Sequence, residues 1–391
     1  MADPSSAKPA GAVRPDAGPA SIASMSLLTA ILFAVGLVLL VGGAEVMVRG
    51  ASRLATALGI SPLVVGLTVV AFGTSSPELA VGIASAVGGS ADIALGNVVG
   101  SNIANILLVL GTAALVMPVT SRIRLVRREV PIMIAASLAL WLMAAAGSIG
   151  RIEGLLLVAA IVTYTAYLIR ASRRETSAIR AEFSEEFGDG RGPAVIVSNL
   201  ALAIVGLAML LLGAQWIVDG AVAFATSLGI PEVIVGLTIV AVGTSLPEIA
   251  TSILAGLRGH RDIAVGNVVG SCIFNILMVL GTSALVASQP IAVDPAMLAV
   301  DLPLMVAAAL ACLPILYTGQ IVSRREGALL VAVYGLYLTY LVLLASASPV
   351  AGAFGLVLIV GVVPLAGITL TVLAVRERAA LRAATADAAT G

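Results

Sequence analysis

Long apolar stretches separated by short polar ones make up most of the chain. Most of these stretches lack Asp, Glu, Lys and Arg over about twenty residues or more, which is the length that crosses the hydrocarbon core of a bilayer as a helix. The pattern predicts about eleven membrane-spanning helices. They are placed at residues 26–48, 61–86, 93–117, 130–147, 152–170, 194–218, 231–256, 263–287, 297–317, 327–346 and 349–375.

The composition supports this interpretation. Hydrophobic residues make up 60% of the chain and charged residues only 11%, whereas about a quarter of a soluble domain is charged. The formal net charge is zero, so nothing points to a nucleic-acid partner. The two cysteines, Cys272 and Cys312, and the single histidine, His260, cannot assemble a zinc cluster or a catalytic triad. We therefore expect no enzyme, no cofactor and no obligate protein partner.

The basic residues predict how the helices thread the membrane. With eleven spans, almost all Lys and Arg fall on one side, and only Lys8, Arg14 and Arg151 fall on the other. The positive-inside rule places the basic side in the cytoplasm. We therefore expect an integral protein of the cell (inner) membrane with its N-terminus outside and its C-terminus in the cytoplasm.

An internal repeat divides the chain. Residues 43–112 match residues 213–282 without a gap, and more than half of the paired positions are identical. In the best stretches GLTVVAFGTSSPE pairs with GLTIVAVGTSLPE, and GNVVGSNIANIL pairs with GNVVGSCIFNIL. Five predicted spans separate the matching helices, so the two copies run in opposite directions through the membrane. Inverted repeats are typical of transporters whose site lies near the midplane. A duplication kept only for packing is the alternative, but it does not explain polar groups at membrane depth.

The repeat defines the expected organisation. The fold class is an all-α polytopic membrane protein with an inverted 5+5 repeat and one extra C-terminal helix. The predicted segments are a disordered tail (1–25), a first five-helix repeat (26–170), a charged cytoplasmic linker (171–193), a second five-helix repeat (194–346), the extra helix (347–375) and a cytoplasmic tail (376–391).

Two carboxylates lie deep in predicted spans. Glu78 and Glu248 each follow a Gly-Thr-Ser-x-Pro run, and an acidic residue at that depth marks a functional site by default. Proline removes a backbone donor and clashes with the preceding turn, so each helix should open locally. The residues that would then offer carbonyl or hydroxyl oxygens are Ala71, Thr74, Ser75, Ala241, Thr244 and Ser245.

The second motif adds further oxygens. Ser101 and Asn105 lie four residues apart on one helix face, and Ser271 and Asn275 match them. Two more side chains one turn earlier either join the site or satisfy backbone groups in a glycine-rich contact; these are Asn97 and Asn267.

An all-oxygen site of this kind suits hard cations. Calcium takes six to eight oxygen ligands, and flexible carboxylates also suit sodium. One Ca²⁺ or two Na⁺ neutralise two carboxylates, so the ions would compete for the same oxygens. We expect no sulfur or imidazole nearby. The alternative is a structural glutamate pair, neutral by protonation and held by hydrogen bonds.

Other charges suggest simpler roles. Glu45 and Arg49 form an expected i,i+4 pair near a helix end. Asp294 and Asp301 lie by a predicted outer loop, where we expect them to be solvated and not to bind an ion.

The paired GTS-x-PE motifs, each followed by GN-V-V-G-S-x-I-x-N, resemble the alpha repeats of the sodium/calcium exchanger family of cation/calcium antiporters, in a prokaryotic-type member. The resemblance covers about residues 43–117 and 213–287. It implies ten helices in an inverted 5+5 topology and the exchange of three sodium ions for one calcium ion. The extra helix and the N-terminal tail are not explained by it.

The resemblance also implies roles for the residues. Glu78 and Glu248 are the implied central ligands of calcium and sodium, joined by oxygens of Thr74 and Thr244. Ser101 and Ser271, with the carbonyls of Ala71 and Ala241, are the implied ligands of the flanking sodium positions. Asn105 and Asn275 are implied to line the middle of the site.

Departures from the family pattern refine the expectation. Asn275 stands where potassium-dependent members carry Asp, which argues against potassium dependence. Gly100 stands where proton-coupled members carry Glu, which favours sodium. Ser76 replaces the usual Leu of the first motif, and the resemblance assigns no role to it. The expected function is electrogenic calcium extrusion by sodium antiport through alternating access. Proton- or other-cation-coupled divalent antiport, and less so a cation channel, remain alternatives.

Overall fold

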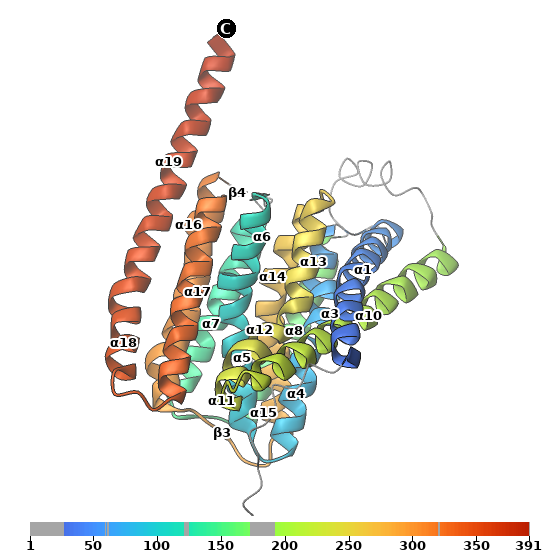
Figure 1. Cartoon of the computed structure of the whole chain (residues 1–391). Helices are drawn as coiled ribbons and strands as arrows, with labels where there is room; N and C mark the ends of the chain where they lie inside the picture. Colours follow the sequence, from blue (N-terminus) through green and yellow to red (C-terminus); the bar gives the residue numbers. More distant parts are fainter. Residues whose placement is uncertain are drawn as a thin grey trace, which may run out of the picture.

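The computed structural model describes residues 27–390 except 59, 61, 121–124, 173–191 and 320. The predicted tail 1–25 and almost all of the predicted linker 171–193 lie outside these residues. The described part is a bundle of helices with two very short strand pairs (Figure 1).

The first half begins with the long helix α1 and then bends. The order is α1 (Leu27–Leu58), α2 (Pro62–Val65), the π-helical turn η1 (Gly66–Val70), α3 (Ala71–Thr74), α4 (Ser76–Val87), α5 (Ala91–Ala104), the π-helical turn η2 (Asn105–Leu110), α6 (Gly111–Val116), β1 (Val119–Thr120), η3 (Leu125–Glu129), α7 (Val130–Ala144), β2 (Ser148–Ile149) and α8 (Arg151–Ser172).

The second half repeats this order. It consists of α10 (Pro193–Ser227), α11 (Glu232–Val235), η4 (Gly236–Val240), α12 (Ala241–Thr244), α13 (Leu246–Leu257), α14 (Arg261–Phe274), η5 (Asn275–Leu280), α15 (Gly281–Val286), β3 (Ile291–Ala292), η6 (Met297–Asp301), α16 (Leu302–Gly319), β4 (Ile321–Val322) and α17 (Arg324–Ala345). The π-helical turns fall at matching positions of the two halves, and π-bulges of this kind are frequent at functional sites.

Eight helices of the described chain are long and apolar enough to cross a bilayer, and two bent pairs bring the number to ten. The bent pairs are the predicted spans 61–86 and 231–256. The predicted span 130–147 corresponds to α7, which has only 15 residues and is shorter than the bilayer core requires. The described chain is therefore that of an all-helical membrane protein, while the number of eleven spans stays a prediction.

The C-terminal segment is helical beyond its predicted end. α18 (Ala351–Val357), η7 (Leu358–Val362) and α19 (Val363–Thr390) follow one another, and α19 extends well past the other helices (Figure 1). We predicted that this helix stops at residue 375. Glu377, Arg378 and Arg382 do not interrupt it, since charged residues with long side chains are good helix formers.

The two strand pairs join the halves at opposite ends of the bundle. β1 pairs with β4 and β2 pairs with β3, both antiparallel. In Figure 1, β4 lies at the end from which α19 projects, and β3 lies at the other end. Each pair therefore takes one strand from each half.

The crossing of α1 and α10 is built from glycine. A Cβ added to Gly43 would lie 2.6 Å from the Leu210 nitrogen and 2.8 Å from the Gly206 oxygen. A Cβ on Gly213 would lie equally close to the backbone of α1 at Gly36 and Leu40. Small residues of this kind let helix backbones approach closely within a membrane. α10 has 35 residues, which is longer than a perpendicular span needs, and it runs obliquely across the bundle (Figure 1).

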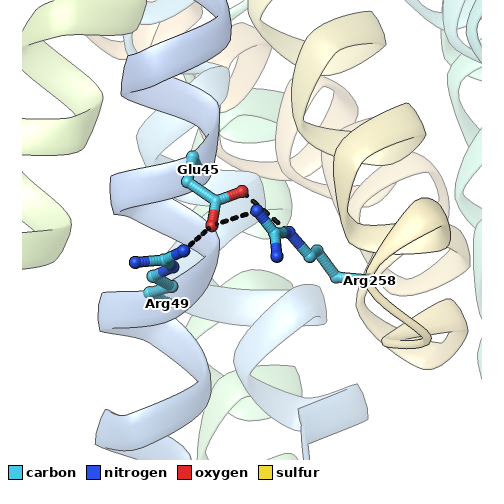
Figure 2. Close-up of polar contacts among 3 residues, drawn as sticks. All are labelled: Glu45, Arg49 and Arg258. Atoms are coloured by element: carbon cyan, nitrogen blue, oxygen red, sulfur yellow. Dashed lines mark hydrogen bonds and ion pairs between the residues drawn. The ribbon is translucent and has the colours of Figure 1, made fainter.

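An ion pair ties α1 to the end of α13. Glu45 lies 2.5 Å from Arg49 on its own helix and 2.7 Å from Arg258, which directly follows α13 (Figure 2). The predicted pair of Glu45 with Arg49 is thus confirmed, and Arg258 joins it. Because both arginine side chains are more than half exposed, the cluster orients the two helices more than it stabilises them.

The glycine crossing makes a testable prediction. Gly43→Ala should destabilise the protein by about 1–3 kcal/mol, because the added methyl group overlaps backbone atoms that cannot rotate away. Gly42→Ala is the matched control, since its Cβ would meet only the flexible Met209 side chain at 3.5 Å. The control should be neutral or stabilising by up to about 1 kcal/mol, because alanine favours helix. Thermal unfolding in detergent measures both variants. Equal midpoints would contradict the close-packed crossing.

Candidate functional site

Each half contains a broken helix at the predicted place. α3 ends at Thr74 and α4 starts at Ser76, with Ser75 at φ −84° and ψ 7°. α12 and α13 are separated in the same way by Ser245, at φ −89° and ψ 0°. The helices bend by 46° and 49° at these points. Proline in the first turn of the following helix cannot donate to the preceding turn, so the predicted opening is confirmed.

The two glutamates lie at these breaks. Glu78 and Glu248 occupy the first turns of α4 and α13 and are only 2% and 1% exposed. Each carboxylate accepts a hydrogen bond from its own backbone N–H, and the two carboxylates are close enough to interact electrostatically. The Oε2 atom of each has no hydrogen-bond partner among the described residues. Both predicted carboxylates thus reach one buried location.

The halves pack crosswise around this location. α3 of the first half lies against α14 of the second, and α12 of the second half lies against α5 of the first. The hydroxyl of Thr74 donates to Asn267 Oδ1 at 3.1 Å and lies 3.5 Å from the Ser271 hydroxyl. Thr74 also approaches the Glu248 carboxylate. The oxygens of one repeat are therefore completed by those of the other.

The equivalent contact between Thr244 and α5 is not formed among the described residues. The Thr244 hydroxyl donates only to its own helix, at 3.1 Å from the Ala241 oxygen. Between this turn and α5 lies a cavity of about 290 Å³, which is lined by Ala241, Thr244, Asn97 and Ser101 among others. Ser101 in turn approaches the Glu78 carboxylate. The site is thus closed where Thr74 meets α14 and open where Thr244 faces α5.

The two asparagines whose role the sequence left open bind the backbone. Asn97 Nδ2 donates to the Glu78 carbonyl at 3.3 Å, and Asn267 Nδ2 donates to the Glu248 carbonyl at 3.5 Å. Asn267 also donates to the Ser252 hydroxyl at 3.1 Å. These bonds hold the turns that carry the glutamates, so both asparagines act as positioning residues.

The other asparagine pair is fully buried. Asn105 and Asn275 are 2% and 1% exposed, and neither Oδ1 atom has a hydrogen-bond partner in the described chain. The Asn275 amide donates to Asn102 Oδ1 at 3.2 Å. Each asparagine begins a π-helical turn, so both side chains come from matching local geometry.

The serines and alanines are placed as follows. Ser75, Ser101, Ser245 and Ser271 are all buried. The Ala71 carbonyl accepts from the Ser75 N–H at 3.0 Å and from the Thr74 hydroxyl at 3.4 Å. The Ser75 N–H therefore occupies one lone pair of this oxygen, and the Thr74 hydroxyl, whose one hydrogen is closer to Asn267 Oδ1, only approaches the other. The Ala241 carbonyl accepts from the Thr244 hydroxyl at 3.1 Å, and Ala241 is one of the residues that line the cavity.

Unpaired buried oxygens concentrate at this site. A buried polar atom without a partner costs roughly 1–3 kcal/mol, so native proteins rarely tolerate several together. Here the set comprises Ser75 Oγ, Glu78 Oε2, Asn105 Oδ1, Glu248 Oε2, Thr251 Oγ1 and Asn275 Oδ1. Five of these six residues were predicted from the repeat. The oxygen donors fit a hard cation such as Ca²⁺ or Na⁺.

One expectation about the surroundings is wrong. We expected no sulfur nearby, yet Cys272 lies on α14 beside Ser271 and its Sγ donates to the Asn102 carbonyl at 3.9 Å. Met305 Sδ accepts from the Asn102 amide at 3.8 Å. Both sulfurs contact Asn102, whose Oδ1 accepts from the Asn275 amide, so they lie one side chain away from the buried asparagine pair.

Three buried polar residues near the site were not predicted from the sequence. Asn102, Thr251 and Ser252 are at most 1% exposed. Their repeat counterparts are Cys272, Val81 and Gly82, so a search for identical positions passes over them. Their polarity within an apolar span was the available signal.

The fold and the site define a membrane transporter of the broken-helix type. The sequence pattern of the sodium/calcium exchanger protein family matches residues 28–170 and 198–343. The chain belongs to this family, as the resemblance of the motifs implied.

Named relatives and solved structures agree. The chain is 33% identical to the sodium/calcium exchanger MaX1 of Methanosarcina acetivorans over 343 residues, covering 80% of this chain and 97% of that protein. It is 38% identical to the inner membrane protein YrbG of Escherichia coli over 207 residues, covering 51% and 62%. The structure of the sodium-calcium exchanger NCX_Mj soaked with zero Na⁺ and Ca²⁺ matches with a TM-score of 0.69 and 28% identity, covering 81% of this chain and 100% of that one.

The bonds of the two positioning asparagines predict unequal effects. Asn267→Ala removes contacts to Thr74, Ser252 and the Glu248 carbonyl, whereas Asn97→Ala removes one hydrogen bond among the described residues, to the Glu78 carbonyl. Each buried group left unpaired costs about 1–3 kcal/mol, so Asn267→Ala should lower the unfolding midpoint in detergent clearly more than Asn97→Ala. Similar midpoints for the two variants would show that the Thr74 contact does not close the site.

Proposed function

We propose that this protein is a secondary antiporter that exchanges Na⁺ for Ca²⁺ at a single site between Glu78 and Glu248. The observation that carries the proposal is the cluster of buried, unpaired oxygens at the two helix breaks. Membership of the sodium/calcium exchanger family and the likeness to MaX1 and NCX_Mj support the choice of ions.

Competition for the same oxygens couples the two ions. The two carboxylates are buried, and uncompensated charge in such a place is costly. One Ca²⁺ or at least two Na⁺ neutralise the pair, and the site has too few oxygens for both sets at once. An ion therefore leaves readily only when the other kind replaces it. This is the requirement for exchange without leak.

We propose that the site alternates between the two ends of the bundle. The Thr74 contact is closed while the Thr244 contact is open, although the two halves share their motifs. In an inverted repeat the two halves can exchange conformations, which would close the second contact and open the first. The placement of the strand pairs at opposite ends of the bundle supports this inverted arrangement.

The proposed orientation places the β3 end outside and the α19 end in the cytoplasm, following the distribution of arginine. Sodium would then enter and calcium would leave the cell. With three sodium ions for each calcium ion, one net charge moves in each cycle. The membrane potential contributes about 2.3 kcal/mol for that charge per 100 mV.

Coupling is tested in proteoliposomes. Purified protein should take up ⁴⁵Ca²⁺ into vesicles loaded with sodium when an outward sodium gradient is present, because departing sodium frees the carboxylates. Because three Na⁺ leave for each Ca²⁺ that enters, one net positive charge moves out in each cycle, so an inside-positive potential clamped with potassium and valinomycin should accelerate this uptake and an inside-negative potential should slow it. Uptake that ignores sodium and follows a pH gradient would assign the protein to proton-coupled antiport. Uptake without any counter-ion would indicate a channel.

The carboxylates are tested separately. Glu78→Gln and Glu248→Gln should each lower sodium-dependent calcium uptake at least about a hundredfold, because one neutral amide leaves too little charge for a divalent ion. Asp219→Asn is the matched control, since Asp219 is exposed on α10 and, within the described part of the chain, accepts only from Gln215. The control should transport at the wild-type rate. Normal calcium flux in either glutamine variant, with folding verified by size exclusion, would refute the proposed site.

A further inference from the structure

The cavity beside the open contact reaches beyond the predicted ligands. Its wall continues from Thr244 and Ser101 to residues of η6 and α17, including Asp301, Tyr334 and Tyr337. Asp301 ends η6, which follows β3 closely, so this part of the cavity lies toward the β3 end of the bundle (Figure 1). The cavity therefore extends from the edge of the carboxylate site toward one end of the membrane domain.

Asp301 is not the solvated loop residue that the sequence suggested. It is partly buried, its carboxylate approaches the Tyr337 hydroxyl, and its Oδ1 atom is buried without a hydrogen-bond partner in the described chain. The prediction does hold for Asp294, which is exposed and accepts from the Ala296 N–H at 2.6 Å. One of the two aspartates thus faces the cavity, while the other satisfies its own loop.

The rest of the cavity wall leaves space for an ion, and no basic side chain is among the described residues that line it. Asp301 is the one charged residue among the described residues that line it. A Cβ added to Gly100 or Gly236 would meet nothing within 4 Å, so these glycines keep the wall open. A volume of about 290 Å³ admits an ion together with several waters. A single buried carboxylate in such a space produces a negative potential that concentrates cations.

We propose that Asp301 is a calcium-binding residue of this cavity, which holds a partly hydrated Ca²⁺ before it passes to Glu78 and Glu248. This inference rests on the proposed exchange function. The Asp301 carboxylate supplies the ligand, water completes the shell, and the Tyr337 hydroxyl lies beside the carboxylate. A calcium site with one carboxylate is weak, which lets the ion move on. Ser101 and Thr244 at the inner end of the cavity receive it.

The proposed role of Asp301 predicts that its substitution changes calcium affinity at only one face of the membrane. Asp301→Asn keeps the shape of the side chain but removes its charge. It should raise the half-saturating calcium concentration about fivefold to tenfold, which corresponds to about 1–1.4 kcal/mol. The change should appear only when calcium is offered at the β3 end. The maximal rate at saturating calcium should stay within twofold of wild type, because Glu78 and Glu248 are intact.

The experiment uses right-side-out and inside-out membrane vesicles from cells that express the full chain. Initial ⁴⁵Ca²⁺ uptake is measured against calcium concentration, with a sodium gradient in the opposite direction. Asp294→Asn is the matched control, because it removes the same charge near the same end but outside the cavity. Asp301→Glu restores the charge and should recover most of the affinity.

The outcomes separate the two proposals. An unchanged half-saturation in Asp301→Asn, an equal change in Asp294→Asn, or a change of the same size at both membrane faces would overturn the role of Asp301. Wild-type uptake that does not depend on sodium would instead overturn the proposed exchange. The comparison of Asp301→Asn with wild type is then made with a pH gradient as the driving force, and it still decides the role of Asp301.

Discussion

The burial of two carboxylates at one place is the constraint on which this structure depends. Glu78 and Glu248 are removed from solvent, and without a cation such a pair is unfavourable both through desolvation and through mutual repulsion. The helix breaks relieve only part of this cost, because each carboxylate accepts from its own backbone N–H while one oxygen remains unpaired. The site is therefore built to be stable when an ion is present, which is what a carrier needs if it is to move only when loaded.

The crosswise packing of the repeats gives the buried carboxylate site two alternative closing contacts, one in each half. α14 is almost wholly buried and supplies Asn267 and Ser271 to the turn that carries Thr74. α5 stands in the same relation to the turn that carries Thr244, but a cavity separates them. Because the sequences of the two contacts are nearly the same, their energies in the closed form should be similar. A modest free energy then separates the two arrangements, and ion binding can decide between them.

Much of the site could be predicted from the sequence because the repeat points to it twice. The Gly-Thr-Ser-x-Pro-Glu run causes the helix break, because proline has no backbone N–H to donate and glycine loosens the turn. The matched serines, Ser101 and Ser271, lie in the motif that follows in each repeat. The roles of Asn97 and Asn267 could not be decided in the same way, because an amide can bind a carbonyl or an ion equally well. Asn102, Thr251 and Ser252 have no identical counterpart, and the π-helical turns leave no clear mark in sequence. Residues that differ between the repeats escape a search for identical positions, and their polarity within an apolar span is the remaining signal in the sequence.

Asp301 illustrates why sequence distance from a loop is a poor guide to solvation. Asp294 and Asp301 lie only a few residues apart, yet η6 turns one of them toward Tyr337 and the cavity while the other stays with its own loop. Helix α18 packs behind this region, where Gly355 lies close to Tyr340 and Val300. The added C-terminal segment thus buttresses the helices that form the cavity wall, although it has no counterpart in the repeat. The family pattern does not explain α18, yet this helix supports the wall of the cavity beside Asp301. In the proposed mechanism it thus shapes the path by which ions reach Glu78 and Glu248, which the family pattern does predict.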